Sequence, residues 1–221
     1  MDGTTPVEFW LTAGHEHVPY AVAREWMHGR SEAVRRGALG AVALLEHDPV
    51  YTLGARAARG SLRVAEAALP APLVETDRGG DVTWHGPGQL VLYPVLDLRA
   101  RGLRAGDYVR ALEVVAIETL AAWDIEGFRV PGRPGVWVDG AKIAAVGVRI
   151  DRGVSRHGLT LNVSCDLGWF DAIVPCGIED AEVTSIARIQ AEVPAIEAVA
   201  ATMARAFERM FGVALVEAVR A

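Results

Sequence analysis

The sequence predicts an α+β protein, built as a single domain with a central mixed or antiparallel sheet flanked by helices. In the middle of the chain, three apolar stretches are joined by short turns, a pattern typical of consecutive antiparallel strands. Apolar residues recur at helical spacing elsewhere, but helices and strands do not alternate regularly as in βαβ proteins. No internal repeat and no linker rich in Pro, Gly and Ser divides the 221 residues, so we expect residues 1–221 to form one domain.

In the first half of the chain, periodicity and turn signals predict five elements: a helix over 20–36, strands over 38–46, 73–76 and 89–98, and a helix over 107–123. Pro19 and Gly37 are the start and stop signals of the first helix. Asp107 is the expected N-cap of the second helix. The segment His47-Asp48-Pro49 is expected to turn the chain after the first strand.

In the second half, the same signals predict strands over 136–138, 141–150 and 154–163, a helix over 192–211 and a strand over 213–216. Asp139-Gly140 is a strong two-residue hairpin signal, and Asp151-Arg152-Gly153 predicts the next turn. Pro194 is a candidate start for the last helix, and the glutamates of the helices, such as Glu113, are expected on solvated faces.

Composition limits the class of protein. Apolar residues make up 51% and charged residues 23%, which is typical of a soluble globular domain. A net charge of −6 argues against a general nucleic-acid binder, and no apolar run approaches the roughly 18 residues of a membrane span. Residues 1–14 lack the basic region of a signal peptide. Two cysteines are too few for a disulfide-stapled secreted domain, so we expect a cytoplasmic protein with reduced thiols that binds neither nucleic acid nor membrane.

One lysine, Lys142, stands among 21 arginines, and a cysteine framed as Pro175-Cys176-Gly177 follows 34 residues later. The frame places the Cys176 thiol on a tight bend, because proline fixes its own φ and glycine frees the chain after it. By this frame alone, a nucleophile and an inert thiol are equally supported. Cys165 lacks the frame, and we expect it to be an inert small hydrophobe. For Lys142, the alternative to a catalytic role is a hairpin residue that points to water.

A thiol and an amine together are the groups that acyl transfer needs. A free thiol has a pKa of ~8.5, so only a small fraction is thiolate at neutral pH, and a nearby ammonium favours the thiolate. Once the thiolate has become a neutral thioester, the ammonium loses its counter-ion and more readily gives up its proton. The resulting amine can then accept a proton from an incoming nucleophile, so one lysine can serve both half-reactions.

Two further segments carry polar groups. Residues 78–89 hold four glycines with Arg78 and His85, but they match neither a P-loop nor a dinucleotide fingerprint, so a ligand-binding segment and a plain connection both remain open. His157 lies among apolar residues, where a single histidine is more often structural than a ligand. The six histidines show no metal-ligand spacing, so we expect no metal.

Taken together, these segments resemble the lipoyl(octanoyl) transferases of the LipB type. The matching stretches occur in family order between about residues 47 and 189: HDPVYTLG at 47–54, RGGDVTWHGPGQL at 78–90, GVWVDGAKIAAVGVRI at 135–150, HGLTLNV at 157–163, IVPCGI at 173–178 and VTSI at 183–186. Trp84 departs from the family, which usually has tyrosine before the histidine.

The resemblance implies a fold similar to the biotin and lipoate protein ligase catalytic domain. It implies that Cys176 is the nucleophile that carries the acyl thioester, with Lys142 as its partner and proton acceptor. It also implies a substrate pocket lined by three stretches: Arg78, Gly79, Gly80, Asp81, Val82, Thr83, Trp84 and His85; Ala145, Val146 and Gly147; and Gly158, Leu159 and Thr160.

The implied reaction moves an octanoyl or lipoyl group from acyl carrier protein to a lysine of lipoyl domains, without a cofactor. The implied acceptors are the lipoyl domains of 2-oxoacid dehydrogenases and the glycine cleavage H protein. Three alternatives stay open at this point. An ATP-dependent lipoate or biotin ligase would need no cysteine, and a non-catalytic lipoyl-domain binder would form no adduct. A thiol redox protein would use Cys165 and Cys176, whose separation lacks the C-x-x-C geometry.

Overall fold

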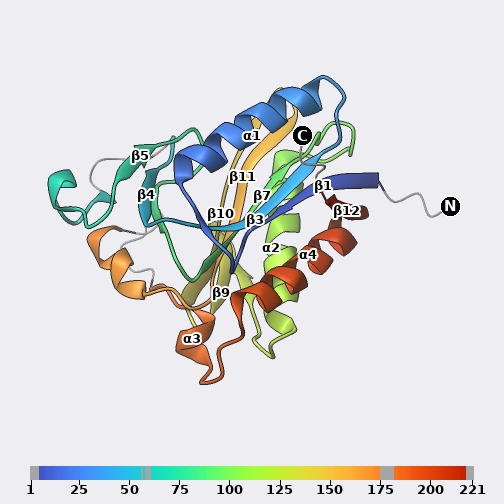
Figure 1. The fold of residues 1–221 in the computed structure, drawn as a ribbon. Helices are drawn as coiled ribbons and strands as arrows, with labels where there is room; N and C mark the ends of the chain where they lie inside the picture. Colours follow the sequence, from blue (N-terminus) through green and yellow to red (C-terminus); the bar gives the residue numbers. More distant parts are fainter. Residues whose placement is uncertain (1–4, 56, 58–60, 175–181, 218–221) are drawn as a thin grey trace.

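The computed structural model describes residues 5–55, 57, 61–174 and 182–217, which form a large mixed sheet with helices on both faces and a small sheet beside it (Figure 1). The predicted α+β fold with a central sheet is confirmed. Across the large sheet the strands run in this order: β12 (Val213–Glu217), β1 (Thr5–Leu11), β3 (Ala41–His47), β7 (Gln89–Val95), β11 (Val154–Asn162), β10 (Ala141–Asp151), β9 (Arg133–Val138) and β8 (Phe128–Val130).

A two-residue strand, β2 (His17–Val18), pairs with β3 outside this order. The small sheet has the order β5 (Leu73–Glu75), β4 (Val50–Leu53) and β6 (Val82–His85). Its strands β4 and β6 pair antiparallel, and β4 and β5 pair parallel. Because β4 follows β3 after only two residues, the small sheet stands directly at one end of the large one.

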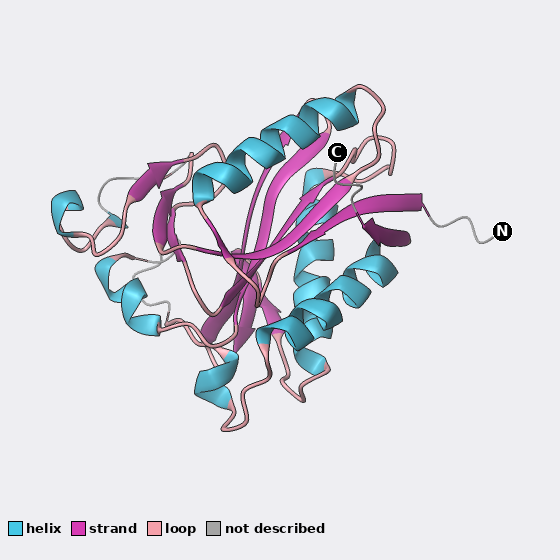
Figure 2. Cartoon of the chain, viewed as in Figure 1, coloured by secondary structure: helices cyan, strands magenta, loops and turns pink. Residues whose placement is uncertain are grey.

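The helices cover the two faces of the large sheet (Figure 2). On one face α1 (Tyr20–Arg35) packs on β7 and β11, and on the other α2 (Ala105–Ala121) packs on β9 to β11 with α4 (Ile196–Phe211) beside it. The described residues also form three shorter elements: η2 (Glu66–Ala68), η3 (Leu167–Ala172) and α3 (Ile186–Ile189). Within the described residues, none of the helices combines the length and the apolarity needed to cross a membrane.

Burial explains the central strands. Every residue of β3, β7 and β11 is buried, as expected for strands with helices on both faces of the sheet. The inner face of α4 carries Val199, Met203 and Phe207, spaced so that they form one apolar stripe. After α4, Gly212 adopts a φ of 60°, the left-handed conformation that commonly ends a helix.

The predicted meander of the second half is confirmed. The strands β9, β10 and β11 pair antiparallel in sequence order. Asp139 and Gly140 have φ values of 48° and 84°, as a two-residue hairpin turn between right-twisted strands requires. Arg152 and Gly153 form the next turn with φ values of 51° and 91°, so that turn has two central residues rather than the three expected.

Several local expectations were wrong. The N-cap of α2 is Arg104, not Asp107; the Asp107 carboxylate instead pairs with the side chains of Arg104 and Arg110. Helix α4 begins at Ile196, two residues after the expected proline. Glu113 is buried rather than solvated, because its carboxylate accepts a hydrogen bond from the Gly135 N–H at 2.9 Å.

Candidate active site

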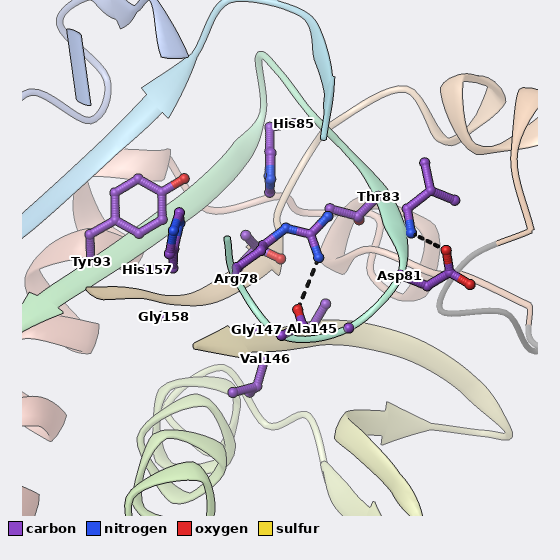
Figure 3. A pocket seen from close by; sticks show the side chains of 14 residues that line it. Arg78, Asp81, Thr83, His85, Tyr93, Ala145, Val146, Gly147, His157 and Gly158 are labelled. Atoms are coloured by element: carbon purple, nitrogen blue, oxygen red, sulfur yellow. Dashed lines mark hydrogen bonds between the residues drawn. The ribbon is translucent and has the colours of Figure 1, made fainter. Parts of the chain in front are cut away.

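A pocket opens between the glycine-rich segment 78–85 and the hairpin of β10 and β11 (Figure 3). Its empty volume is about 470 Å³, with the open solvent at its mouth included. The lining residues are Arg78, Gly79, Gly80, Asp81, Val82, Thr83, His85, Tyr93, Ala145, Val146, Gly147, His157, Gly158 and Thr160.

The glycines let the segment lie directly on the hairpin. The Gly79 N–H donates to the Val148 carbonyl at 2.9 Å, and a Cβ on Gly147 would lie 3.0 Å from the Gly79 carbonyl oxygen. A Cβ on Gly54 would lie 2.4 Å from the Gly80 carbonyl oxygen. Close backbone approach, rather than loop flexibility, is therefore the physical reason for small residues in this part of the chain.

Twelve of the fourteen residues predicted for substrate binding line this pocket, and Trp84 and Leu159 do not. Trp84 stacks on Trp169 in the small core between β6 and η3, and Leu159 lies in the main core beneath the sheet. Strand alternation explains both positions, because neighbours in a strand point to opposite faces. The prediction treated a sequence stretch as one surface, although the Trp84 side chain of β6 and the Leu159 side chain of β11 point away from the pocket.

Two lining residues, Tyr93 and His157, were missed. A lone histidine among apolar residues, such as His157, was expected to be structural, and Tyr93 lies on the fully buried strand β7. A signal for Tyr93 existed in the pairing of β7 with β11, which places Tyr93 beside the strand that carries Gly158.

Arg78 is 7% exposed, and its guanidinium is held by the small sheet. Its Nη2 donates to the Thr52 carbonyl at 2.6 Å and to the Thr52 hydroxyl at 2.8 Å, and its Nη1 donates to the Gly79 carbonyl at 3.2 Å. The cation is therefore fixed beside the pocket by oxygens of Thr52 on β4 and of Gly79.

A chain of buried side-chain hydrogen bonds links the pocket to the neighbourhood of Lys142. The Asn162 amide donates to the Thr184 carbonyl at 2.9 Å, which leaves the Asn162 oxygen to accept from Gln89 at 2.9 Å. The Gln89 oxygen, 2.8 Å from His85 Nδ1, must then accept from it. His85 therefore carries its proton on Nδ1, and its Nε2 accepts from the Thr52 hydroxyl at 3.2 Å.

Lys142 lies on β10 beside a second, smaller cavity and is 4% exposed. The alternative of a lysine that points to water is therefore wrong. Its Nζ lies 4.9 Å from the centre of the Trp137 ring, a cation–π distance. Thr83, Ala145 and Thr160 line both cavities, so the space beside Lys142 adjoins the larger pocket.

The backbone of Lys142 is paired with the segment that follows residues 175–181. Its N–H donates to the Glu182 carbonyl at 2.8 Å, and its carbonyl accepts from the Thr184 N–H at 2.9 Å. Cys176 itself lies outside the described residues. Cys165 is buried, and burial raises the pKa of its thiol to about 12, which fits the expected inert residue.

Two buried histidines, His47 and His157, contact Tyr93, and a third, His85, packs against His47. The ring of His47 bonds the Tyr93 hydroxyl at 2.9 Å, and the His157 ring meets the edge of Tyr93. Burial is the main cause of a lowered pKa in all three histidines. The pKa of His47 falls to about 4, that of His85 lies well below its usual value, and that of His157 also lies below its usual value. Among the described residues, no three His, Cys, Asp or Glu side chains gather as a metal site would require.

These histidines should make the fold acid-sensitive. An unfolded histidine titrates near pH ~6.5, and the folded pKa values lie lower, so the unfolded state binds more protons as the pH falls from ~6.5 towards ~4. The unfolding free energy that these histidines contribute is therefore fully present above pH ~6.5 and is lost through that window. The loss for His47 alone is about 3 kcal/mol. Urea unfolding at pH 7 and pH 5 measures the difference.

The control variants are His47→Gln, which should flatten the pH dependence of the unfolding free energy, and His28→Gln at an exposed position, which should not. Equal unfolding free energies at the two pH values would contradict this account.

Comparison with known proteins agrees with the fold and the sequence motifs. Residues 22–208 match the family model described as the lipoyl protein ligase A/B catalytic domain. The chain is 44% identical to an octanoyltransferase of Acidobacterium capsulatum over 88% of this chain and 87% of that protein. It is 47% identical to one of Mycobacterium avium over 76% and 73%.

Among solved structures, Ta0514 from T. acidophilum, a protein described as a putative lipoate protein ligase, superimposes with a TM-score of 0.73. The superposition covers 97% of this chain and 89% of that chain at 15% identity, so it supports the fold alone. The family model and the curated relatives together show that this chain belongs to the lipoyl protein ligase A/B catalytic domain family and, within it, to the octanoyltransferases, which are acyltransferase enzymes.

Proposed function

We propose that the chain, acting as a single domain in the cytoplasm, transfers an octanoyl or lipoyl group from acyl carrier protein to a lysine of lipoyl domains. The acceptors would be the lipoyl domains of 2-oxoacid dehydrogenases and the glycine cleavage H protein. The observation that carries the proposal is the position of Lys142, which is buried beside a cavity that adjoins the larger pocket. A buried amine beside a pocket with small and apolar lining residues suits an acyl chain and its reacting carbonyl.

In the first half-reaction the Cys176 thiolate attacks the thioester carbonyl of the donor. A new C–S bond forms, and the carrier-protein thiolate leaves. One thioester replaces another, so the step is close to balanced in free energy and needs no ATP. The Lys142 ammonium would favour the attacking thiolate, as expected for a cationic neighbour.

In the second half-reaction the acceptor lysine attacks the acyl-enzyme carbonyl. The Lys142 ammonium, without its thiolate counter-ion, first loses its proton to the solvent and becomes a neutral amine. An amide bond then forms, the Cys176 thiolate leaves, and the proton of the attacking amine passes to the neutral Lys142, which restores the ammonium–thiolate pair. Formation of an amide from a thioester runs downhill. The small side chain of Ala145 would leave room for the alkyl chain in the larger pocket.

The backbone geometry around Lys142 supports a role for Cys176. Glu182 and Thr184, which follow the segment that contains Cys176, are hydrogen bonded to the Lys142 backbone. At the other end of that segment, the Val174 N–H donates to the Ser61 carbonyl at 2.7 Å. Asn162 holds the Thr184 carbonyl and so supports the same arrangement.

Acyl transfer without ATP tests the proposal against a ligase of the same fold. Purified enzyme, octanoyl-acyl carrier protein and an apo lipoyl domain should give octanoylated lipoyl domain, detected by intact mass, in a nucleotide-free buffer. The control replaces the donor with free octanoic acid and adds ATP and Mg²⁺, which should give no product. Product formation only from octanoic acid with ATP would instead identify an ATP-dependent ligase, and binding of the lipoyl domain without any product would identify a binding module.

A further inference from the structure

His157 lies at one end of the larger pocket with an unusual backbone and an unsatisfied ring nitrogen. It is 2% exposed and adopts a φ of 55° within β11, in the left-handed region that non-glycine residues rarely occupy. Its Nε2 lies 2.8 Å from the Asp77 carboxylate, and its buried Nδ1 has no hydrogen-bond partner among the described residues. A strained residue with an unsatisfied polar atom in a pocket is a reason to look for a ligand.

The partners of Asp77 decide which ring nitrogen of His157 carries the proton. The hydrogen bond from His157 and the nearby Arg156 guanidinium hold the pKa of Asp77 well below its usual range, so the carboxylate is ionised and can only accept. His157 Nε2 must then carry the hydrogen. Burial lowers the pKa of His157, which keeps the ring neutral near pH 7. The Nδ1 atom therefore presents a bare lone pair.

Two donors that line the described pocket, Tyr93 and Arg78, are already engaged. His47 Nδ1 lies 2.7 Å from the Val18 carbonyl, so it must donate there, and His47 Nε2 then accepts from the Tyr93 hydroxyl at 2.9 Å. The Arg78 guanidinium donates to Thr52 and to the Gly79 carbonyl. Figure 3 shows His157 between Tyr93 and Arg78 at one side of the pocket.

Strand register places His157 at the end of the pocket far from Lys142. Ala145 pairs with Thr160 where the two cavities join, and His157 pairs with Val148 three residues further along the hairpin, roughly 10 Å away at the strand rise. An extended eight-carbon acyl chain advances by about 1.2 Å for each carbon–carbon bond, so it spans roughly 8–9 Å. A chain whose carbonyl lies where the two cavities join, at Ala145 and Thr160, would thus bring its last carbons towards His157.

We propose that His157 Nδ1 forms a hydrogen-bond-accepting subsite for the far end of the acyl chain, so that the pocket takes medium-chain acyl groups with a hydroxyl or other donor at that end. This inference rests on the proposed acyl transfer and adds a specificity-determining residue to it. A purely apolar pocket would reject such a group, because a buried hydroxyl without a partner is costly.

The Asp77→Asn variant should reverse this preference. Arg156 donates to one carboxylate oxygen of Asp77, so the amide oxygen of asparagine would face Arg156 and its NH₂ would face His157 Nε2. The Nε2 atom would then accept, and the proton would move to Nδ1. The subsite would become a donor and would favour an acyl chain that carries only an acceptor.

Three carrier-protein thioesters test the inference: octanoyl, 8-hydroxyoctanoyl and 7-oxooctanoyl, the last bearing only an acceptor near its end. In the wild type, kcat/KM for the 8-hydroxy donor should exceed that for the 7-oxo donor about tenfold or more, the effect of one unsatisfied buried polar group. In Asp77→Asn this ratio should fall to about one or below, because a protonated His157 Nδ1 can no longer accept a hydrogen bond from the hydroxyl and can donate one to the oxo group. Asp151→Asn is the matched control, because Asp151 is 39% exposed against 40% for Asp77 and also pairs with an arginine.

The outcomes separate the two proposals. Equal ratios in the wild type and Asp77→Asn, with octanoyl transfer intact, would overturn the subsite alone. Failure of all three donors with folded enzyme would overturn the acyl transfer. The subsite is tested independently by ¹⁵N NMR of the histidine rings in the wild type. A proton on His157 Nδ1 would overturn it. An unchanged chemical shift of that nitrogen on addition of 8-hydroxyoctanoic acid would overturn it as well.

Discussion

Replacing Lys142 with methionine should lower kcat for octanoyl transfer by about 10²–10⁴-fold, the usual loss when a general acid–base group is removed. Methionine keeps a long apolar side chain against Trp137, so the packing of β10 is largely retained while the amine is lost. The measurement is the initial rate of lipoyl-domain octanoylation at saturating donor, together with the thermal unfolding midpoint. A variant that is folded and keeps more than about a tenth of wild-type kcat would contradict the assigned role.

A Lys142→Arg variant separates the two tasks of the lysine. Arginine keeps the positive charge but does not give up its proton near neutral pH, so it can favour a thiolate yet cannot accept a proton. Single-turnover experiments should therefore show acyl-enzyme formation in Lys142→Arg and a much slower transfer to the lipoyl domain. Equal slowing of both steps would indicate that geometry, rather than proton transfer, limits the variant.

The fold was predictable from the sequence where local signals and burial agreed. The hairpin at Asp139-Gly140 and the helix after Pro19 combine a turn or start signal with a clear periodicity, and both were found. The strands β1 and β4 were missed. Strand β1 joins the large sheet through parallel pairing with β3 and β12, and parallel partners from distant parts of the chain leave no local signal.

The site was predictable as a set of sequence stretches but not as a surface. Resemblance pointed to Arg78 and Gly147, which do line the pocket, but it included Trp84, whose side chain points into the small core. The orientation of Glu113 depends on a single backbone N–H of a distant strand, a contact that no helical pattern encodes. The unsatisfied nitrogen of His157 likewise appears only when the partners of Asp77 are known in three dimensions.

Replacing Cys176 with serine should abolish the acyl-enzyme and reduce transfer to the background rate. A serine hydroxyl at this position does not ionise near neutral pH as a thiol beside an ammonium does, so it is a weak nucleophile. Its ester would also differ in free energy from the donor thioester, so the exchange would no longer be close to balanced. Wild-type enzyme incubated with octanoyl-acyl carrier protein should gain one octanoyl group by intact mass, and hydroxylamine should remove it.

Cys165→Ser is the matched control for the loss of a thiol. The Cys165 side chain is buried and its thiol pKa is raised to about 12, so its loss should leave both the adduct and the transfer rate close to wild type apart from a modest loss of stability. An adduct that persists in Cys176→Ser but disappears in Cys165→Ser would move the nucleophile to the buried cysteine. Normal transfer by a wild-type enzyme that never shows a hydroxylamine-labile adduct would remove the covalent mechanism and leave direct attack by the acceptor lysine on the carrier-protein thioester, with Lys142 as its base.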